Sequence, residues 1–230
     1  MDKRGRLFVV GTPIGNLQDM TQRAVDVLSK VNFILSEDTR ESKKLLDAYK
    51  IQNAKQISYR DQNHKKVFPM VLDLLSSGND LALVSDSGTP LISDPGFKLV
   101  AGAIDGGFEV VAIPGPSAIA AALSISGLPT DKFSFLGFLP KSSGQRSQLL
   151  KTYGMLDSTL VIYESPFRVN KLLEEINATL GNRYVCLCKE LTKVYEECVR
   201  GSVQNLLNSG LTYKGEYVVL VAKEGYALNG

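Results

Sequence analysis

Four segments in the first half of the chain combine glycine, proline, hydroxyl and carboxylate residues directly after short apolar runs. They are Gly11 to Gly15, Glu37 to Arg40, Ser85 to Gly96 and Pro114 to Ala118. Glycine lets a backbone approach a ligand closely because it has no Cβ atom, and carboxylates and hydroxyls can orient a ligand or take a proton from it. Residues of these types suit ligand binding and group transfer.

The longest of these segments is Ser85 to Gly96. Its second residue, Asp86, is followed by a serine, a glycine and a threonine. Connections between elements are usually about 4 to 6 residues long, so this longer one favours a functional loop over a plain turn. Asp86 could accept hydrogen bonds from ligand hydroxyls or an ammonium group, or it could cap the turn itself. Asp94 directly precedes Pro95, which favours a helix N-cap with proline at the first helical position.

The spacing of these residues argues against three familiar kinds of site: a dinucleotide-binding loop, a Walker P-loop and a hydrolase nucleophile. Gly11 to Gly15 does not fit the Gly-x-Gly-x-x-Gly pattern, and Pro13 removes a backbone donor, although Glu37 keeps a nicotinamide-nucleotide site open. The chain has no Gly-Lys dipeptide and therefore no Walker P-loop. Ser117 lacks the glycine two residues later that a hydrolase nucleophile needs, and it is better read as an N-cap facing an anion.

The cysteines and the histidine give no catalytic or metal signal. Cys186, Cys188 and Cys198 are odd in number, which indicates reduced core or strand thiols rather than a disulfide framework. Cys186 and Cys188 share one face of an expected strand, but His64 is the only histidine, so a tetrahedral zinc set is incomplete and no metal is predicted. His64 lies in a polar stretch that favours a solvated loop or cap residue.

The elements that must position these residues follow from alternating short apolar runs and longer amphipathic stretches. The expected strands are 6–10, 31–36, 80–85, 109–113, 158–163, 184–189, 196–200 and 217–222; the expected helices are 21–30, 42–50, 65–76, 95–105, 117–126 and 167–180. This alternation predicts an α/β protein with a mostly parallel sheet first, because parallel neighbours need helical crossovers. Shorter connections later in the chain predict a mixed sheet.

Two α/β domains are expected, residues 1–127 and 128–230, because turn residues at 127–131 interrupt the pattern. Ligands of open α/β sheets bind outside the carboxyl ends of the strands. The four segments all follow strands of the first domain, so they are predicted to form one site. Two further segments, Tyr163 to Arg168 and Lys189 to Lys193, also follow strands. They are either separate surface turns or, as the pattern favours, a second wall of the same site.

The composition is that of a globular protein, with 230 residues, 44% of them hydrophobic and 22% charged. Residues 110–130 form the best uncharged run, but prolines, glycines and serines interrupt it, so no membrane span is expected. No leader-like segment opens the chain, which favours a cytoplasmic location.

The net charge of +2 neither requires nor excludes nucleic acid. A local phosphate-binding surface, or merely solvated helix faces, is suggested by Arg40, Lys43, Lys44, Lys65 and Lys66.

Taken together, the motifs resemble those of the ribosomal RNA small-subunit methyltransferase I family, the 2′-O-ribose cytidine methyltransferases of the tetrapyrrole methylase superfamily. The motifs that carry the resemblance are Val10 to Asp19, Ser36 to Arg40, Leu83 to Gly96, Ile113 to Ala118, Ser126 to Pro129, Gly137 to Pro140, Tyr163 to Pro166 and Lys189 to Lys193. They span nearly the whole chain. The stretch Ser85 to Gly96 especially distinguishes this branch from the porphyrin-ring methylases.

The resemblance implies two α/β domains that bind S-adenosyl-L-methionine between them, and a homodimer. The residues implied to contact this methyl donor are Pro13, Ile14, Asp86, Ser87, Gly88, Thr89, Ile92, Ser117, Ala118, Pro166, Leu191, Thr192 and Glu216. The implied reaction is methyl transfer to the ribose 2′-oxygen of a cytidine in 16S ribosomal RNA of the small subunit.

A carboxylate of Glu37 or Asp38 is then the candidate proton acceptor or ribose orienter, with Arg40 holding phosphate; a structural ion pair between Arg40 and one of these acids is the alternative. Arg168 joins the candidate RNA-binding residues. Two other functions stay open. A tetrapyrrole C-methyltransferase would methylate a porphyrinoid and not ribosomal particles, whereas a non-catalytic ribosome-assembly module would bind ribosomal RNA without transferring methyl groups.

Overall fold

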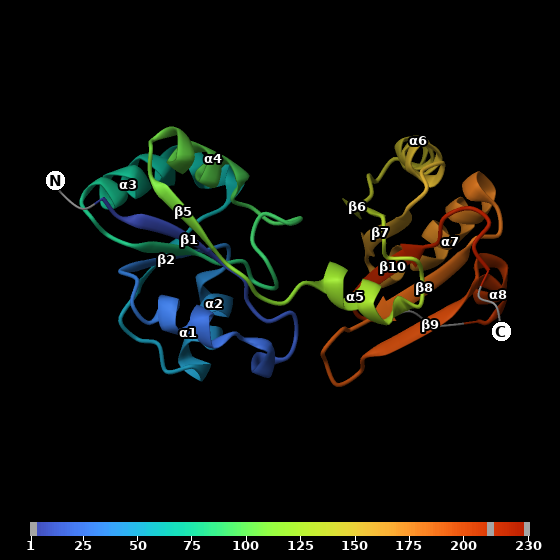
Figure 1. Cartoon of the computed structure of the whole chain (residues 1–230), viewed down its shortest axis with the longest axis horizontal. Helices are drawn as coiled ribbons and strands as arrows, with labels where there is room; N and C mark the ends of the chain where they lie inside the picture. Colours follow the sequence, from blue (N-terminus) through green and yellow to red (C-terminus); the bar gives the residue numbers. More distant parts are fainter. Residues whose placement is uncertain (1–3, 211–213, 228–230) are drawn as a thin grey trace. The chain divides into compact units, whose positions relative to one another are not determined.

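The computed structural model describes residues 4–210 and 214–227, and the chain divides into two compact units, Met1–Ser117 and Ala118–Gly230. Each unit has its own sheet (Figure 1). The division falls before helix α5 (Ala118–Ser126), whereas the turn residues at 127–131 favour a boundary after it. Because α5 packs against strands β8 (Tyr184–Lys189) and β10 (Tyr217–Val221), it belongs with the second unit.

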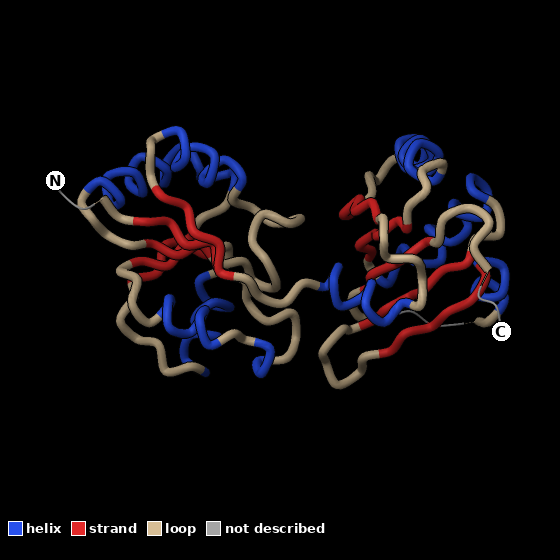
Figure 2. The backbone as a smooth tube through the Cα atoms, in the orientation of Figure 1, coloured by secondary structure: helices blue, strands red, loops and turns tan. Residues whose placement is uncertain are grey.

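Unit 1 has a parallel sheet, as predicted, with helices on both faces; the sheet has five strands, one more than expected (Figure 2). Its strands are β1 (Arg6–Val10), β2 (Phe33–Ser36), β3 (Lys55–Ser58), β4 (Leu81–Leu83) and β5 (Glu109–Ile113), in the order β3-β2-β4-β1-β5. Its helices are α1 (Gln22–Leu28), α2 (Thr39–Ala48), α3 (His64–Ser76) and α4 (Phe97–Asp105), with 3-10 turns η1 (Leu17–Asp19) and η2 (Asp61–Asn63).

Alternating strand residues build two separate cores on the two faces of this sheet. Phe8 of β1 packs with α1 and α2, while its neighbour Leu7 packs with α3 and α4, as the period of two in a strand requires. Strands β2, β4, β1 and β5 are neighbours and run in parallel. Their carboxyl ends therefore lie side by side at one edge, which we call the carboxyl edge of unit 1.

Two helix starts differ from the sequence prediction. Helix α2 begins at Thr39 rather than at residue 42, because the Asp38 side chain accepts a hydrogen bond from the Arg40 amide and caps it. The prediction that Asp94 caps the next helix is wrong. Helix α4 starts at Phe97, and the residue before it, Gly96, has φ 133°, a conformation that stops a right-handed helix from extending back to Asp94.

Unit 2 has a mixed sheet, as predicted; its five strands, of which β6 was not expected, lie in the order β6-β7-β10-β8-β9. Strands β6 (Phe133–Phe138) and β7 (Thr159–Glu164) are parallel; the pairs β7–β10, β10–β8 and β8–β9 (Glu197–Ser202) are antiparallel. Helices α6 (Ser143–Gly154), α7 (Pro166–Leu180) and α8 (Val203–Asn208) share a core with one face of the sheet. None of the helices described is long and apolar enough to cross a membrane.

Candidate functional site

Backbone contacts hold three of the loops at the carboxyl edge of unit 1 in fixed positions. The Thr12 amide donates to the Gly88 carbonyl at 2.8 Å, and the Thr12 hydroxyl donates towards the Ser85 and Gly88 carbonyls at 3.3 and 3.2 Å. Gly11 and Gly115 touch so closely that a Cβ built on Gly11 would lie 2.8 Å from the Gly115 Cα atom. The loops after β1, β4 and β5 therefore form one packed unit.

The loop between β4 and α4 has an unusual backbone conformation. Gly88 has φ 79°, and a Cβ there would lie 3.2 Å from the Ile14 side chain. Leu91 and Ser93, which are not glycines, also have positive φ angles of 73° and 64°. Strained residues of this kind cluster at binding and catalytic sites, which supports the prediction that this long connection is functional.

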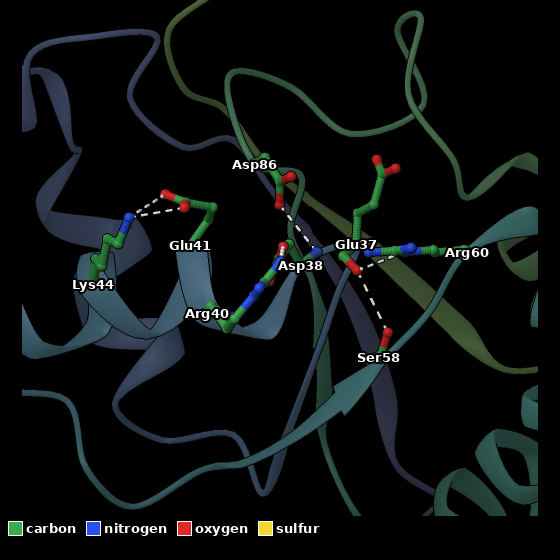
Figure 3. A network of polar contacts seen from close by, with 8 residues as sticks. All are labelled: Glu37, Asp38, Arg40, Glu41, Lys44, Ser58, Arg60 and Asp86. Carbon is green, nitrogen blue, oxygen red and sulfur yellow. Dashed lines mark hydrogen bonds and ion pairs between the residues drawn. The ribbon is translucent and has the colours of Figure 1, made fainter.

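The fourth loop joins the others through Asp38 and Asp86. The Asp38 amide donates to an Asp86 carboxylate oxygen at 3.2 Å (Figure 3). The Asp38 carboxylate pairs with Arg40, with Nε 3.0 Å away, and hydrogen bonds from the Arg40 side chain and amide hold the Asp38 pKa far below its usual value. A carboxylate held in this way is a poor proton acceptor, so Asp38 positions α2 and Arg40.

Glu37 differs from Asp38 because its carboxylate forms no hydrogen bond or ion pair with the described residues. Its carbonyl oxygen accepts hydrogen bonds from Arg60 Nε at 3.0 Å and Ser58 Oγ at 3.4 Å. In Figure 3 the side chain points away from both of these partners. The backbone of Glu37 is thus anchored, while its half-buried carboxylate is available to a ligand.

Asp94 is a second carboxyl group with altered properties in this region. Burial raises its pKa from 3.8 to about 6; a hydrogen bond with the Ser85 side chain opposes the rise, and the charges of Glu37 and Asp86 add to it. The structure therefore places three carboxyl groups near one another at the carboxyl edge. The sequence did not predict that Asp94 lies beside the other two carboxyl groups, because the local sequence Asp-Pro-Gly also fits a helix cap.

We expect Asp94→Asn to stabilise the protein at pH 7.5 by about 1 to 2 kcal/mol, allowing about 1.4 kcal/mol per pKa unit and discounting for partial exposure. The pKa of Asp94 is raised in the folded state, so its ionisation costs stability as the pH rises from about 4 to about 6. Asparagine removes that charge. Urea unfolding of both proteins at pH 4 and pH 7.5 measures the difference, which should disappear at pH 4; an equal difference at both pH values would contradict the argument.

The residues of unit 2 that were expected to contact the donor also meet at one edge of their sheet. Tyr217, the first residue of β10, pairs with Glu164 and Lys189 at the ends of β7 and β8. The segments that follow those strands contain Pro166, Leu191 and Thr192, and Glu216 precedes Tyr217.

Charged contacts tie two of these segments together. The Glu190 carboxylate accepts the Glu216 amide at 2.9 Å, and Lys193 Nζ lies 3.1 Å from Glu190 and 2.8 Å from Glu216. Thr192 has φ 66°, and its buried hydroxyl oxygen has no hydrogen-bond partner among the described residues. A buried polar atom without a partner costs free energy, so this hydroxyl is suited to a ligand.

The remaining predicted site residues are distributed as follows. Pro13 and Gly88 are buried; Ile14, Thr89, Ser117 and Ala118 are partly buried; Asp86, Ser87 and Ile92 are exposed.

The basic residues expected to bind RNA lie on two helices of unit 1: Arg40, Lys43 and Lys44 on α2, and Lys65 and Lys66 on α3. These two helices cover opposite faces of the sheet, but both begin at its carboxyl edge. Arg168 donates to the Leu139 and Pro140 carbonyls at 3.2 and 3.3 Å and lies 3.4 Å from Glu164.

His64 is the C-cap of η2 and the first residue of α3, so it is a cap residue, as predicted, although it is partly buried rather than fully solvated. Its Nδ1 atom lies 2.9 Å from the Tyr59 hydroxyl, and its ring stacks on Phe68 with the ring centres 4.8 Å apart. Phe68 lies four residues after His64 on the same face of α3, whereas Tyr59 precedes the helix and reaches His64 from the connection after β3. His64 therefore helps to pack the start of α3.

A parallel sheet with loops meeting at its carboxyl edge, followed by a mixed sheet, defines the class of this protein. Residues 6–207 match the family model of the Tetrapyrrole (Corrin/Porphyrin) Methylases, and the chain belongs to this family of methyltransferases. The structure of uroporphyrin III C-methyl transferase from Thermus thermophilus shares the fold, with a TM-score of 0.65 and 15% identity over 95% of this chain and 97% of that one.

More similar relatives carry the name Ribosomal RNA small subunit methyltransferase I. The protein of that name from Halalkalibacterium halodurans is 44% identical over 97% of this chain and 78% of its own length. The one from Thermotoga maritima is 43% identical over 89% of this chain and 91% of its own length. The resemblance inferred from the motifs, and the fold class, are thereby confirmed.

Proposed function

We propose that this protein transfers the methyl group of S-adenosyl-L-methionine to the ribose 2′-oxygen of a cytidine in 16S ribosomal RNA. The observation that carries the proposal is the set of four interlocked loops at the carboxyl edge of unit 1, where ligands of open α/β sheets bind. The relatives' name supplies the substrate class, because they are ribosomal RNA small-subunit methyltransferases.

The proposed donor-binding residues fit a ligand with amino-acid, ribose and adenine parts. In unit 1, the contact of Gly11 with Gly115 leaves no side chain between the loops, and Asp86 offers an exposed carboxylate to an ammonium or hydroxyl group. In unit 2, Thr192 offers a buried hydroxyl that has no partner within the part of the chain that the structure describes. The donor supplies a methyl group on a positively charged sulfur that is already a good leaving group.

Glu37 is the residue we propose as the acceptor of the ribose hydroxyl proton. Its carboxylate forms no hydrogen bond or ion pair with the described residues, whereas that of Asp38 is committed to Arg40 and to the cap of α2. Asp38 therefore acts as a positioning residue. The Arg40 side chain is 84% exposed despite its pairing with Asp38, so it can contact an RNA phosphate from the same edge.

We propose that Arg40, Lys43 and Lys44 of α2 and Lys65 and Lys66 of α3 bind the RNA backbone, with Arg168 contributing from unit 2. For Lys43→Gln we expect a several-fold loss of affinity for small subunits, together with a decrease of about 0.7 to 0.9 in the slope of log affinity against log salt concentration. Lys50→Gln is the matched control, since Lys50 follows the opposite end of α2. Filter binding across salt concentrations measures both; equal slopes for the two variants would contradict this surface.

The proposed function is tested by incubating the protein with labelled S-adenosyl-L-methionine and small subunits from cells that lack the endogenous activity, followed by nuclease mapping. Incorporation at one ribose 2′-oxygen is the expected result. Transfer to a porphyrinoid alone would support tetrapyrrole methylation, and subunit binding without incorporation would support an assembly module. The proposal includes a cytoplasmic homodimer, which light scattering of the purified protein and cell fractionation would test.

A further inference from the structure

Three thiol groups meet on the sheet of unit 2, on the face that is covered by α5. Cys186 and Cys188 lie two residues apart on β8 and are fully buried. The strand register places Cys198 of β9 directly opposite Cys188. The Cys188 sulfur lies 3.6 Å from that of Cys186 and 2.8 Å from that of Cys198, and all three sulfurs lie within 4.8 Å of one another.

Sulfur atoms at these separations can surround one metal ion. Zinc–sulfur bonds are about 2.3 Å long, so three sulfurs arranged around one ion lie about 4 Å apart. The Cys186–Cys188 separation of 3.6 Å is close to this value. The Cys188–Cys198 separation has to lengthen by about 1 Å, and Cys198 is the partly exposed member of the three, whose side chain has room to turn.

The charge of Arg200 adds an independent argument. Arg200 lies opposite Cys186 on β9, and its guanidinium donates to the carbonyls of Ser126 at 2.9 Å, Cys198 at 3.3 Å and Ile125. Carbonyl groups are neutral, and no carboxylate of the described residues forms an ion pair with Arg200. Three thiolates around a divalent ion carry one negative charge, which this guanidinium balances.

We propose that Cys186, Cys188 and Cys198 bind one thiophilic d10 metal ion, zinc(II), as a three-thiolate site. Soft thiolate ligands select ions of this kind, and a water molecule on the side of Cys198 completes four-coordination. The thiol protons pass to solvent on binding. The ion joins β8 to β9, the two strands whose connection contains Leu191 and Thr192, so it fixes the hairpin from which these residues project.

The test is metal analysis of the full chain purified without chelator under anaerobic, reducing conditions. We expect one zinc ion per chain, retained against a micromolar chelator, and X-ray absorption showing three sulfur ligands at about 2.3 Å. Cobalt(II) in place of zinc is expected to give intense thiolate charge-transfer bands. The apparent Tm is expected to rise by several degrees with bound metal.

Cys198→Ser is the first variant to make, because Cys198 is the least buried of the three and its loss disturbs packing least. We expect at least a 100-fold loss of zinc affinity. Val199→Ala is the matched control, since Val199 packs against the opposite face of the sheet, and this variant should keep the metal. Absence of stoichiometric zinc, unchanged affinity in Cys198→Ser, a Cys188–Cys198 disulfide in the anaerobic protein, or retention of copper(I) in place of zinc would each overturn the proposal.

Discussion

Glu37→Gln is expected to lower the rate of methyl transfer at least 100-fold, with the donor affinity unchanged and the unfolding midpoint unchanged or slightly raised. Glutamine keeps the shape of the side chain but does not accept a proton, and a positioned general base contributes about 10²- to 10⁴-fold. The Glu37 carboxylate forms no hydrogen bond or ion pair with the described residues, so its replacement removes no structural contact. Single-turnover methyl incorporation at saturating donor measures the effect.

Glu41→Gln is the matched control for this prediction. Glu41 lies in the first turn of α2, whereas Glu37 precedes the helix, and the Glu41 carboxylate binds Lys44 at 2.8 Å. We therefore expect nearly normal turnover. Asp38→Asn is informative as well, because it weakens the contact with Arg40. Near-normal turnover in both the Glu37→Gln and the Asp38→Asn proteins would exclude a carboxylate of this segment as the proton acceptor.

Gly115→Ala is expected to reduce donor affinity about 100-fold and to lower the free energy of unfolding by about 1 to 3 kcal/mol. A Cβ on Gly115 would lie 2.7 Å from backbone atoms of Gly11, which cannot turn away as a side-chain end can. The loops after β1 and β5 must then separate by nearly 1 Å. A displacement of about 1 Å costs about 100-fold in rate when it misaligns a reacting group, and we expect a loss of the same order in donor affinity because these loops are the proposed donor site. Overpacking lowers the free energy of unfolding by about 1 to 3 kcal/mol.

Gly144→Ala separates this effect from a general effect of removing a glycine. Gly144 lies in the first turn of α6, and a Cβ there would meet no atom within 4 Å, so we expect unchanged or slightly higher stability. Isothermal titration with the donor and urea unfolding measure both variants. If Gly115→Ala bound the donor as tightly as Gly144→Ala, the close approach of the two loops would have no part in donor binding.

The sequence predicted eight of the ten described strands, all but β3 and β6, because their apolar runs are unbroken. Strand β3 was missed because Lys55–Ser58 contains only one aliphatic residue; β3 lies at the edge of its sheet and pairs only with β2, so polar residues are tolerated there. Helix α6 was missed for a different reason. Its sequence is largely polar, and one of its buried residues is Arg146, whose guanidinium pairs with Glu175 of α7. Such a long-range partner is invisible to a local pattern.

The candidate site was predicted at the level of loops rather than of individual atoms. Glycine, proline and acidic residues after consecutive strands were sufficient to place four loops at one edge. The sequence could not show that the Asp38 carboxylate is paired and the Glu37 carboxylate is not. This difference depends on the Arg40 side chain folding back to contact Asp38, the N-cap of its own helix. Cys198 was missed as a partner of Cys188 because the pairing depends on the register of an antiparallel hairpin, which a one-residue slip would change.

The position of β10 in the second sheet has a consequence for synthesis of the chain. Strand β10 is the last of the described strands along the chain but lies in the middle of its sheet, between β7 and β8. All five strands of unit 1 are complete by Ile113, so that unit can fold while translation continues. Unit 2 must wait for β10, and until then β7 and β8 each present an unpaired apolar edge. Nascent chains that stall before Tyr217 are therefore expected to aggregate or recruit chaperones.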